Sequence, residues 1–319
     1  MNCRTQGAPY KTDGWNAERV CSCYGEKQSG YLTQGSMLIR RQDIGVLLFY
    51  YLGYSRTRNL LLRLKHQPVA RFVTYHDLPP EVVGQFRAHL HFLRRNTNVV
   101  SLDDFFGGRL TSGKMNVVIT FDDGYKSWVR VAVPMLLELG LPATFFVSSG
   151  FVGLTAEGET EFMRSKLLSQ PDDSGKLTGG LGIEDLKQIV ESGFTVGGHT
   201  VNHCDLAEQG DEDRLRYEIA EDKRRLEQIT GKPVAYFAYP TGKHINPKIR
   251  LADVLRESGY KGAVTTVSGF NRAGTDPFFL HRELTDASMQ ERVFRARVFG
   301  NYDAVRSLKR GMRRVFHKR

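Results

Sequence analysis

The chain has 319 residues and a formal net charge of +10 at pH 7. That length is enough for one large domain with a buried core plus extensions. A basic excess favours acidic partners, but no nucleic-acid recognition motif accompanies the basic residues, so we do not expect nucleic-acid binding. The four cysteines, Cys3, Cys21, Cys23 and Cys204, fit neither a disulfide framework nor a standard zinc spacing.

The first 36 residues differ in character from the rest of the chain. Residues 1–36 are polar and glycine-rich, and they contain no apolar run of the kind found in signal peptides or transmembrane helices. We expect this segment to be disordered or wrongly assigned to the protein. Met37 is therefore an alternative start.

Residues 37–71 form a basic N-terminal segment with an apolar centre at residues 44–52. An apolar run of about ten residues is shorter than the roughly twenty needed to span a bilayer. We therefore expect either a basic amphipathic helix at an anionic membrane surface or a helix packed against the main domain. The basic residues are Arg40, Arg41, Arg56, Arg58, Arg63, Lys65 and Arg71.

Strand-like and helix-like stretches alternate along the rest of the chain. Runs of β-branched and aromatic residues predict strands, and apolar residues three and four apart predict helices. This repeated order implies a parallel sheet with right-handed crossovers. The expected strands are 71–77, 117–121, 143–147, 194–196, 234–240 and 262–267; the expected helices are 81–95, 125–139, 183–192, 211–230 and 249–258; and residues 148–180 are expected to form an insertion.

The expected strand 117–121 ends abruptly in two carboxylates, Asp122 and Asp123, followed by Gly124, which permits a sharp turn. Carboxylates are costly to remove from water without a partner. Two in succession at the end of a buried strand therefore require a metal, an arginine or solvent. A solvated acidic turn is the alternative interpretation.

A pair of histidines follows the expected strand 194–196. Gly197 and Gly198 allow the chain to turn so that His199 and His203 can reach one point. Two imidazoles with this spacing and one carboxylate form a ligand set for zinc or another divalent ion, with positions left for water. Together with the two aspartates, the pair favours a metal site over a purely structural role.

The motifs at Thr120–Gly124 and His199–His203 resemble those of polysaccharide deacetylases of the NodB-homology group, carbohydrate esterase family four. The similarity extends from about Thr74 to Thr285. It implies an α/β fold, a distorted (β/α) barrel with fewer than eight units, formed by residues 72–300. In this family the first strand often ends in a Tyr-His pair near the mouth of the site, which corresponds here to Tyr75 and His76. His76 is therefore expected either to line the pocket or to make a structural hydrogen bond.

The resemblance also implies a division of roles among the motif residues. Asp123, His199 and His203 are expected to hold a divalent metal, zinc or alternatively cobalt or nickel. Asp122 is expected to take the proton of the attacking water as the general base. The expected reaction is removal of acetyl groups from an N-acetylated glycan or a lipid-linked amino sugar.

The third motif of the family corresponds to Tyr239, Pro240 and Thr241, where the residue after the proline donates a backbone N–H to the oxyanion. A tight turn is the alternative interpretation. Many members carry an arginine in this motif that braces the catalytic aspartate, whereas this chain has Ala238. Arg282 is the candidate substitute, because a guanidinium can orient a carboxylate from another strand; a surface arginine is the alternative.

The family's late Leu-x-His motif, which supplies a histidine as general acid, has no clear copy after residue 260. We prefer His281 over His244 for this role because His281 follows an apolar run on a late expected strand. Two other functions stay open. One is an amidase or deformylase acting on a small non-polymeric amide, and the other is a catalytically silent carbohydrate-binding protein of the same fold.

Residues 301–319 form a basic C-terminal tail in which apolar residues recur every three to four positions. The tail is expected either to contact an anionic membrane surface or to pack on the barrel. Glycan deacetylases generally meet their substrates outside the cytoplasm or at its membrane. We therefore expect the protein at a membrane surface or outside the cytoplasm, although no export signal is visible.

Overall fold

The computed structural model describes residues 41–306, except residues 55, 56, 58, 59, 61–66, 169–177, 243, 245, 247 and 248. Several sequence expectations therefore lie outside the described residues: the polar segment 1–36, the alternative start at Met37, the basic residues Arg40, Arg56, Arg58, Arg63 and Lys65, residues 169–177 of the expected insertion, and the tail beyond Arg306. Among the helices in the described ranges, none has both the length and the apolar character needed to cross a bilayer.

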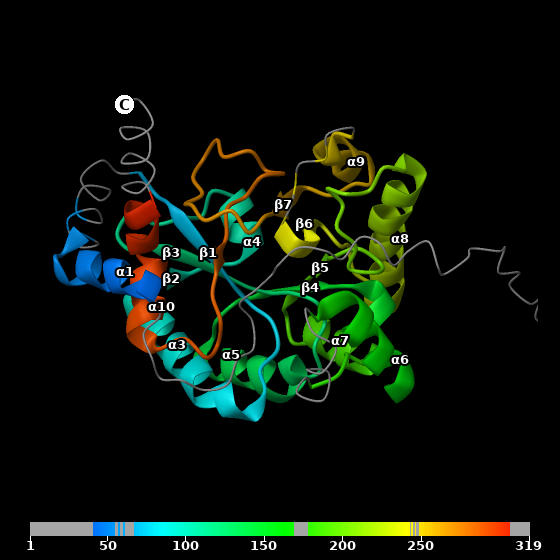
Figure 1. Ribbon diagram of the computed structural model, residues 1–319, viewed down its shortest axis with the longest axis horizontal. Helices are drawn as coiled ribbons and strands as arrows, with labels where there is room; N and C mark the ends of the chain where they lie inside the picture. The colour runs from blue at the N-terminus through cyan, green and yellow to red at the C-terminus, as the bar shows by residue number, and fades with distance from the viewer. Residues whose placement is uncertain are drawn as a thin grey trace, which may run out of the picture.

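A curled parallel sheet forms the centre of the molecule, and helices surround it (Figure 1). The strand order is β7-β6-β5-β4-β3-β1-β8, with β2 paired to β3. An isolated parallel bridge joins Val264 of β7 to Leu280, in the segment that precedes β8. This is the expected distorted barrel. The strands are β1 (Ala70–Tyr75), β2 (Asn98–Val99), β3 (Asn116–Phe121), β4 (Thr144–Val147), β5 (Thr195–Gly198), β6 (Tyr236–Ala238), β7 (Gly262–Val264) and β8 (Glu283–Leu284).

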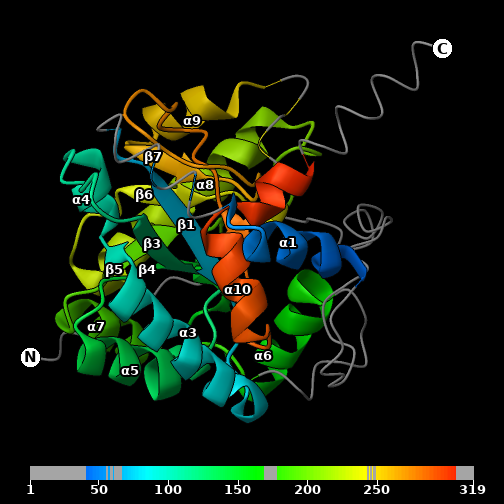
Figure 2. The ribbon, with the colours of Figure 1, turned by 90° about the vertical axis from the view of Figure 1, so that its left-hand side faces the viewer.

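The helices lie on the outer side of this sheet, and α1 packs beside α10 at one edge (Figure 2). Val46 of α1 contacts Ala296 and Val305 there, so the two ends of the described chain meet. The helices are α1 (Arg41–Tyr51), α3 (Val83–Asn96), α4 (Leu102–Phe106), α5 (Val133–Leu139), α6 (Ala156–Phe162), α7 (Ile183–Glu191), α8 (Glu212–Thr230), α9 (Leu251–Glu257) and α10 (Glu291–Val298).

Most expected elements are present, with bounds that differ by a few residues. The sequence analysis missed β2 and β8, because a strand of two residues is too short for an alternating pattern. The helix expected over residues 125–139 begins as a π-helix at Trp128–Ala132 and becomes α-helical only at Val133.

Alternation along the strands decides which side chains reach the barrel interior. In β3, Val118 belongs to the inner apolar cluster, whereas Ile119 and Phe121 belong to the outer one. Thr120 shares the inner face with Val118, and Asp122, two residues further, follows the same direction. The strand therefore delivers its first carboxylate to the inside of the barrel rim.

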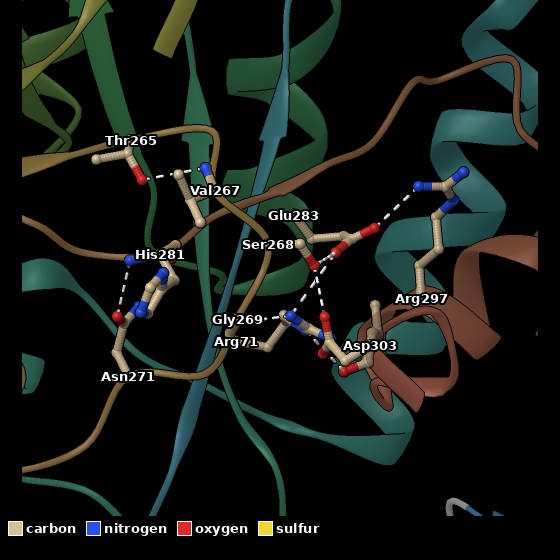
Figure 3. Close-up of polar contacts among 11 residues, drawn as sticks. Arg71, Thr265, Val267, Ser268, Gly269, Asn271, His281, Glu283, Arg297 and Asp303 are labelled. Atoms are coloured by element: carbon tan, nitrogen blue, oxygen red, sulfur yellow. Dashed lines mark hydrogen bonds and ion pairs between the residues drawn. The ribbon is translucent and has the colours of Figure 1, made fainter. Parts of the chain in front are cut away.

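A largely buried network of ion pairs links Arg71, at the start of β1, to Asp303, near the end of the described residues (Figure 3). The Arg71 guanidinium pairs with Asp303 and lies 3.7 Å from Glu283. Arg297 approaches the other oxygen of Glu283 at 2.9 Å, and the Ser268 hydroxyl donates to Asp303 at 2.7 Å. Residues far apart in the sequence are thus joined behind the barrel wall.

Replacing Arg71 by alanine should lower the free energy of unfolding by about 3–5 kcal/mol, because the variant removes the cation paired with Asp303 and one of the two cations beside buried Glu283. Urea denaturation measures this change. Arg256→Ala is the matched control. Arg256 pairs with Asp253 at 2.7 Å, but both side chains are exposed, so the loss should be below about 1 kcal/mol. Equally small losses in both variants would contradict a stabilising role for the network.

Candidate metal centre and active site

Asp123 and the two histidines of the second motif converge at the carboxyl ends of β3 and β5. His199 Nε2 and His203 Nε2 each lie 3.3 Å from the same oxygen, Asp123 Oδ1. Asp123 and His199 are almost completely buried, and the His203 side chain is 13% exposed. The three residues therefore form a compact, largely buried cluster whose potential ligand atoms all lie within 4.8 Å of one another.

The second nitrogen of each imidazole is fixed by a backbone carbonyl. His199 Nδ1 lies 2.7 Å from the carbonyl oxygen of Ala238, and His203 Nδ1 lies 3.0 Å from that of Lys166. Each Nδ1 must donate its proton to that carbonyl, which in the neutral ring leaves a lone pair on Nε2. Metal-ligating histidines are commonly oriented in this way.

The cluster fits a divalent cation. Two Nε2 lone pairs and a carboxylate oxygen face one another, an arrangement that repels unless positive charge lies among them. Without a metal, that charge is a proton. Although burial lowers the pKa of His203, its hydrogen bond and ion pair with Asp123 raise it overall. Asp123, Nε2 of His199 and Nε2 of His203 would hold the ion, in a mixed nitrogen and oxygen set suited to zinc.

The backbone around this cluster is strained. In the described part of the chain, the non-glycine residues with positive φ are Asp123, Thr200, His203 and Thr241, with φ of 89°, 65°, 50° and 58°. All four lie at or beside the proposed motifs. Such conformations cost about 1–3 kcal/mol each and often occur at functional sites.

Arg282 contacts the other motif aspartate. Its Nη1 atom donates to Asp122 Oδ1 at 2.7 Å and also lies within hydrogen-bond distance of the Thr74 and Thr120 hydroxyls. The arginine is fully buried, and Phe146 packs beneath the guanidinium. Arg282 therefore lies inside the barrel and is paired with Asp122.

The charges around Asp122 and Asp123 keep both carboxylates ionised. Burial raises the pKa of Asp122, but the charge of Arg282, followed by that of His199, lowers it below its ordinary value. Burial also raises the pKa of Asp123, and hydrogen bonds from His199 and His203 lower it well below that value. The charge of His76 acts in the same direction on both carboxylates.

The third-motif residues follow β6 at the same rim. The Tyr239 hydroxyl donates to the carbonyl oxygen of Phe278 at 3.1 Å, and Pro240 is buried. Thr241 adopts a left-handed φ of 58° before Gly242. Ala238, in the position of the family's arginine, instead accepts the hydrogen bond from His199.

The structure does not bring His281 to this cluster. His281 and Arg282 are neighbours in an extended segment, so their side chains point to opposite sides. Figure 3 shows His281 beside Asn271, on the side of the wall that carries the Arg71 network. Burial lowers the pKa of His281, and the nearby charges that act on it are those of Asp303, Arg71 and His244. His244 packs against Phe279, with ring centroids 4.2 Å apart.

The sequence analysis missed two carboxylates beside the site. Glu218 and Asp222 of α8 are buried and accept hydrogen bonds from the backbone of the His199–His203 loop. Cys204, next to His203, is a partly buried thiol whose pKa is raised by burial.

Comparison with known proteins indicates the same family as the sequence motifs. A family model described as polysaccharide deacetylase matches residues 109–263. The protein YxkH of Bacillus subtilis (strain 168), which carries a provisional polysaccharide deacetylase name, is 24% identical over 216 residues, covering 66% of this chain and 68% of YxkH.

Two solved structures share the fold. IcaB from Ammonifex degensii is 26% identical, with a TM-score of 0.59, over 73% of this chain and 98% of IcaB. The deacetylase PplD from Streptococcus pyogenes is 20% identical, with a TM-score of 0.57, over 73% of this chain and 99% of PplD. On the agreement of matched sequence, fold and motifs, the chain carries a polysaccharide deacetylase domain, of a family of hydrolases that act on carbon–nitrogen bonds other than peptide bonds.

Proposed function

We propose that this protein removes acetyl groups from an N-acetylated glycan or a lipid-linked amino sugar, and that it requires a divalent metal. The observation that carries the proposal is the meeting of Asp123, His199 and His203 at one point, with Asp122 beside them and fixed by Arg282. The description of the matching family model, polysaccharide deacetylase, and the provisional name of YxkH support a carbohydrate substrate.

Asp122 acts as the general base in this proposal. A divalent ion bound at the cluster would polarise the acetamide carbonyl and lower the pKa of water. Zinc is the expected ion, because proteins commonly bind zinc through histidine nitrogen and carboxylate oxygen atoms; cobalt and nickel are the alternatives. Arg282 holds Asp122 ionised and in one orientation, so the carboxylate can accept the water's proton. The backbone N–H of Thr241 is the candidate donor to the oxyanion, and Tyr239 and Pro240 shape the turn that presents it.

The leaving amine needs a proton, and His76 is the better candidate than His281 to supply it. His76 follows β1 at the same rim, and its charge acts on both Asp122 and Asp123. His281 faces the other side of the barrel wall. Asp122 is the alternative donor, because it holds the proton that it took from water.

We also propose that the protein docks on an anionic membrane surface through α1. Leu48, Tyr51 and Leu52 are 56%, 70% and 73% exposed, while Val46 fixes the helix to the core. Val305 contacts Val46 of the same helix, and the sequence that follows Arg306 is basic. Basic residues near an anionic surface contribute about 1 kcal/mol each.

Asp122→Asn should lower the rate of acetate release from N-acetylglucosamine oligomers by about 100- to 10,000-fold, because the amide cannot accept the water's proton. Zinc binding should persist in this variant, whereas His199→Ala should lose it. Both are measured on metal-stripped protein reloaded with zinc. Release from a small amide but not from any oligomer would favour an amidase, and zinc binding without any release would favour a silent binding protein.

His76→Gln should reduce kcat by about 100-fold or more if its imidazole supplies the proton. His281→Gln is the matched control and should leave kcat within twofold, because its ring faces away from the cluster. The measurement is steady-state deacetylation, with zinc content checked in each preparation. The reverse pattern would return the general acid to His281.

Replacing Leu48, Tyr51 and Leu52 together by serine should reduce co-flotation with vesicles that contain phosphatidylserine, because it removes the apolar part of the docking face. Leu137→Ser, at a position on α5 that is 53% exposed and so similar to Leu48, should leave flotation unchanged. Equal flotation of all three proteins would show that α1 does not dock on lipid.

A further inference from the structure

The loop that carries the two histidines is held from one side by helix α8. Thr200 and His203 adopt left-handed φ within this loop, and non-glycine residues keep such conformations only when their surroundings impose them. The metal ligands therefore depend on contacts outside the motif. Those contacts come from two acidic side chains one helical turn apart, Glu218 and Asp222.

Asp222 joins the two turns that carry the cluster. Its Oδ2 atom accepts the His199 N–H at 2.8 Å, and its Oδ1 atom accepts the Ser149 N–H at 2.9 Å. Ser148, the neighbour of Ser149, donates its N–H to the carbonyl oxygen of Asp123 at 3.1 Å and its hydroxyl to that of His199 at 3.1 Å. One carboxylate thus fixes the backbone of His199 relative to that of Asp123.

Glu218 holds the second half of the loop. Its Oε2 atom accepts the Asn202 N–H at 2.9 Å, and its Oε1 atom accepts a side-chain N–H of Asn202 at 2.7 Å. Its carbonyl oxygen also accepts the Val201 N–H at 3.2 Å. Asn202 directly precedes His203, so this contact fixes the backbone that carries the second imidazole.

Glycines allow α8 to come this close. A Cβ at Gly198 would lie 2.8 Å from Asp222 Oδ2 and 2.2 Å from the Tyr260 hydroxyl. A Cβ at Gly150 would lie 2.4 Å from the carbonyl oxygen of Val201. Any larger residue at either position would push the loop away from the acids or from the turn after β4.

Neither acid has the partner that a buried charge ordinarily needs. Asp222 and Glu218 are 0% and 1% exposed, and no ion pair within the described ranges includes either of them. Burying carboxylates without a cation is unfavourable. What they contact instead is the backbone of the ligand loop.

We propose that Asp222 and Glu218 are positioning residues that fix the His199–His203 loop and thereby set the geometry and affinity of the metal site. The inference rests on the proposed function in one respect, which is that the cluster binds a divalent metal. Neither acid touches the reacting atoms. Both act through the backbone of the ligands.

The test is Co²⁺ binding by the full chain. Asp222→Asn replaces one accepting oxygen by an amino group, which cannot accept an N–H. Competition with a chromophoric chelator should show Co²⁺ bound about 10- to 100-fold more weakly than by the wild-type protein. The visible spectrum of bound Co²⁺ should change as well, because the imidazoles are no longer held in one orientation.

Glu227 offers a matched control on the same helix. Its Oε1 atom accepts the Val234 N–H at 2.9 Å and pairs with Lys223, away from the ligands. Glu227→Ala should unfold at a lower urea concentration than wild type but keep its Co²⁺ affinity within twofold. An equal loss of Co²⁺ affinity in Glu227→Ala would overturn the inference, because stability alone would then explain the effect.

Unchanged Co²⁺ affinity and spectrum in folded Asp222→Asn would also overturn it. If Asp222→Asn does not fold, Glu218→Gln decides in its place, since it disturbs the contacts to Asn202 and Cys204 and leaves those of Asp222 intact. Weaker Co²⁺ binding supports the inference and wild-type binding overturns it. A wild-type protein that binds no Co²⁺ would overturn the proposed metal dependence and this inference together.

Discussion

The withdrawal of carboxylates from water at one rim of the barrel is the constraint on which the rest of the site depends. Asp122, Asp123, Glu218 and Asp222 are each at most 5% exposed. A buried carboxylate is unfavourable unless cations or hydrogen-bond donors compensate it. The turns after β3, β4 and β5 and the segment before β8 all bring such donors to the rim, so the loops around the site are arranged by this electrostatic requirement.

The kind of partner decides what each carboxylate can do. Asp122 faces the guanidinium of Arg282, which lowers its pKa despite burial and leaves it able to accept a proton. Asp222 faces backbone N–H groups, which have no net charge, and burial raises its pKa to about 7. A neighbouring cation therefore keeps a buried carboxylate ionised and able to accept a proton. A carboxylate that instead accepts hydrogen bonds from backbone N–H groups fixes the position of those backbone segments.

The sequence predicted the ligand cluster because its signals are local. A strand that ends in Asp122 and Asp123, and a glycine turn before His199 and His203, each specify their own geometry within a few residues. The sequence analysis placed both His281 and Arg282 in one site, although the two residues are neighbours in an expected strand. Consecutive residues of an extended segment point to opposite sides, so the contact of Arg282 with Asp122 implies that His281 faces elsewhere.

The acids of α8 were missed for a different reason. In a helix with many charges, Glu218 and Asp222 resemble solvated residues when they are judged one at a time. Their spacing carries a signal, however, because the buried residues of α8 are Leu215, Glu218, Ile219, Asp222 and Leu226, a single helical stripe. A carboxylate within the stripe that faces the core cannot be solvated and must have donors there. Such acids can be recognised from sequence, whereas their donors, the N–H groups of His199 and Asn202, are revealed only by the packing of α8 on β5.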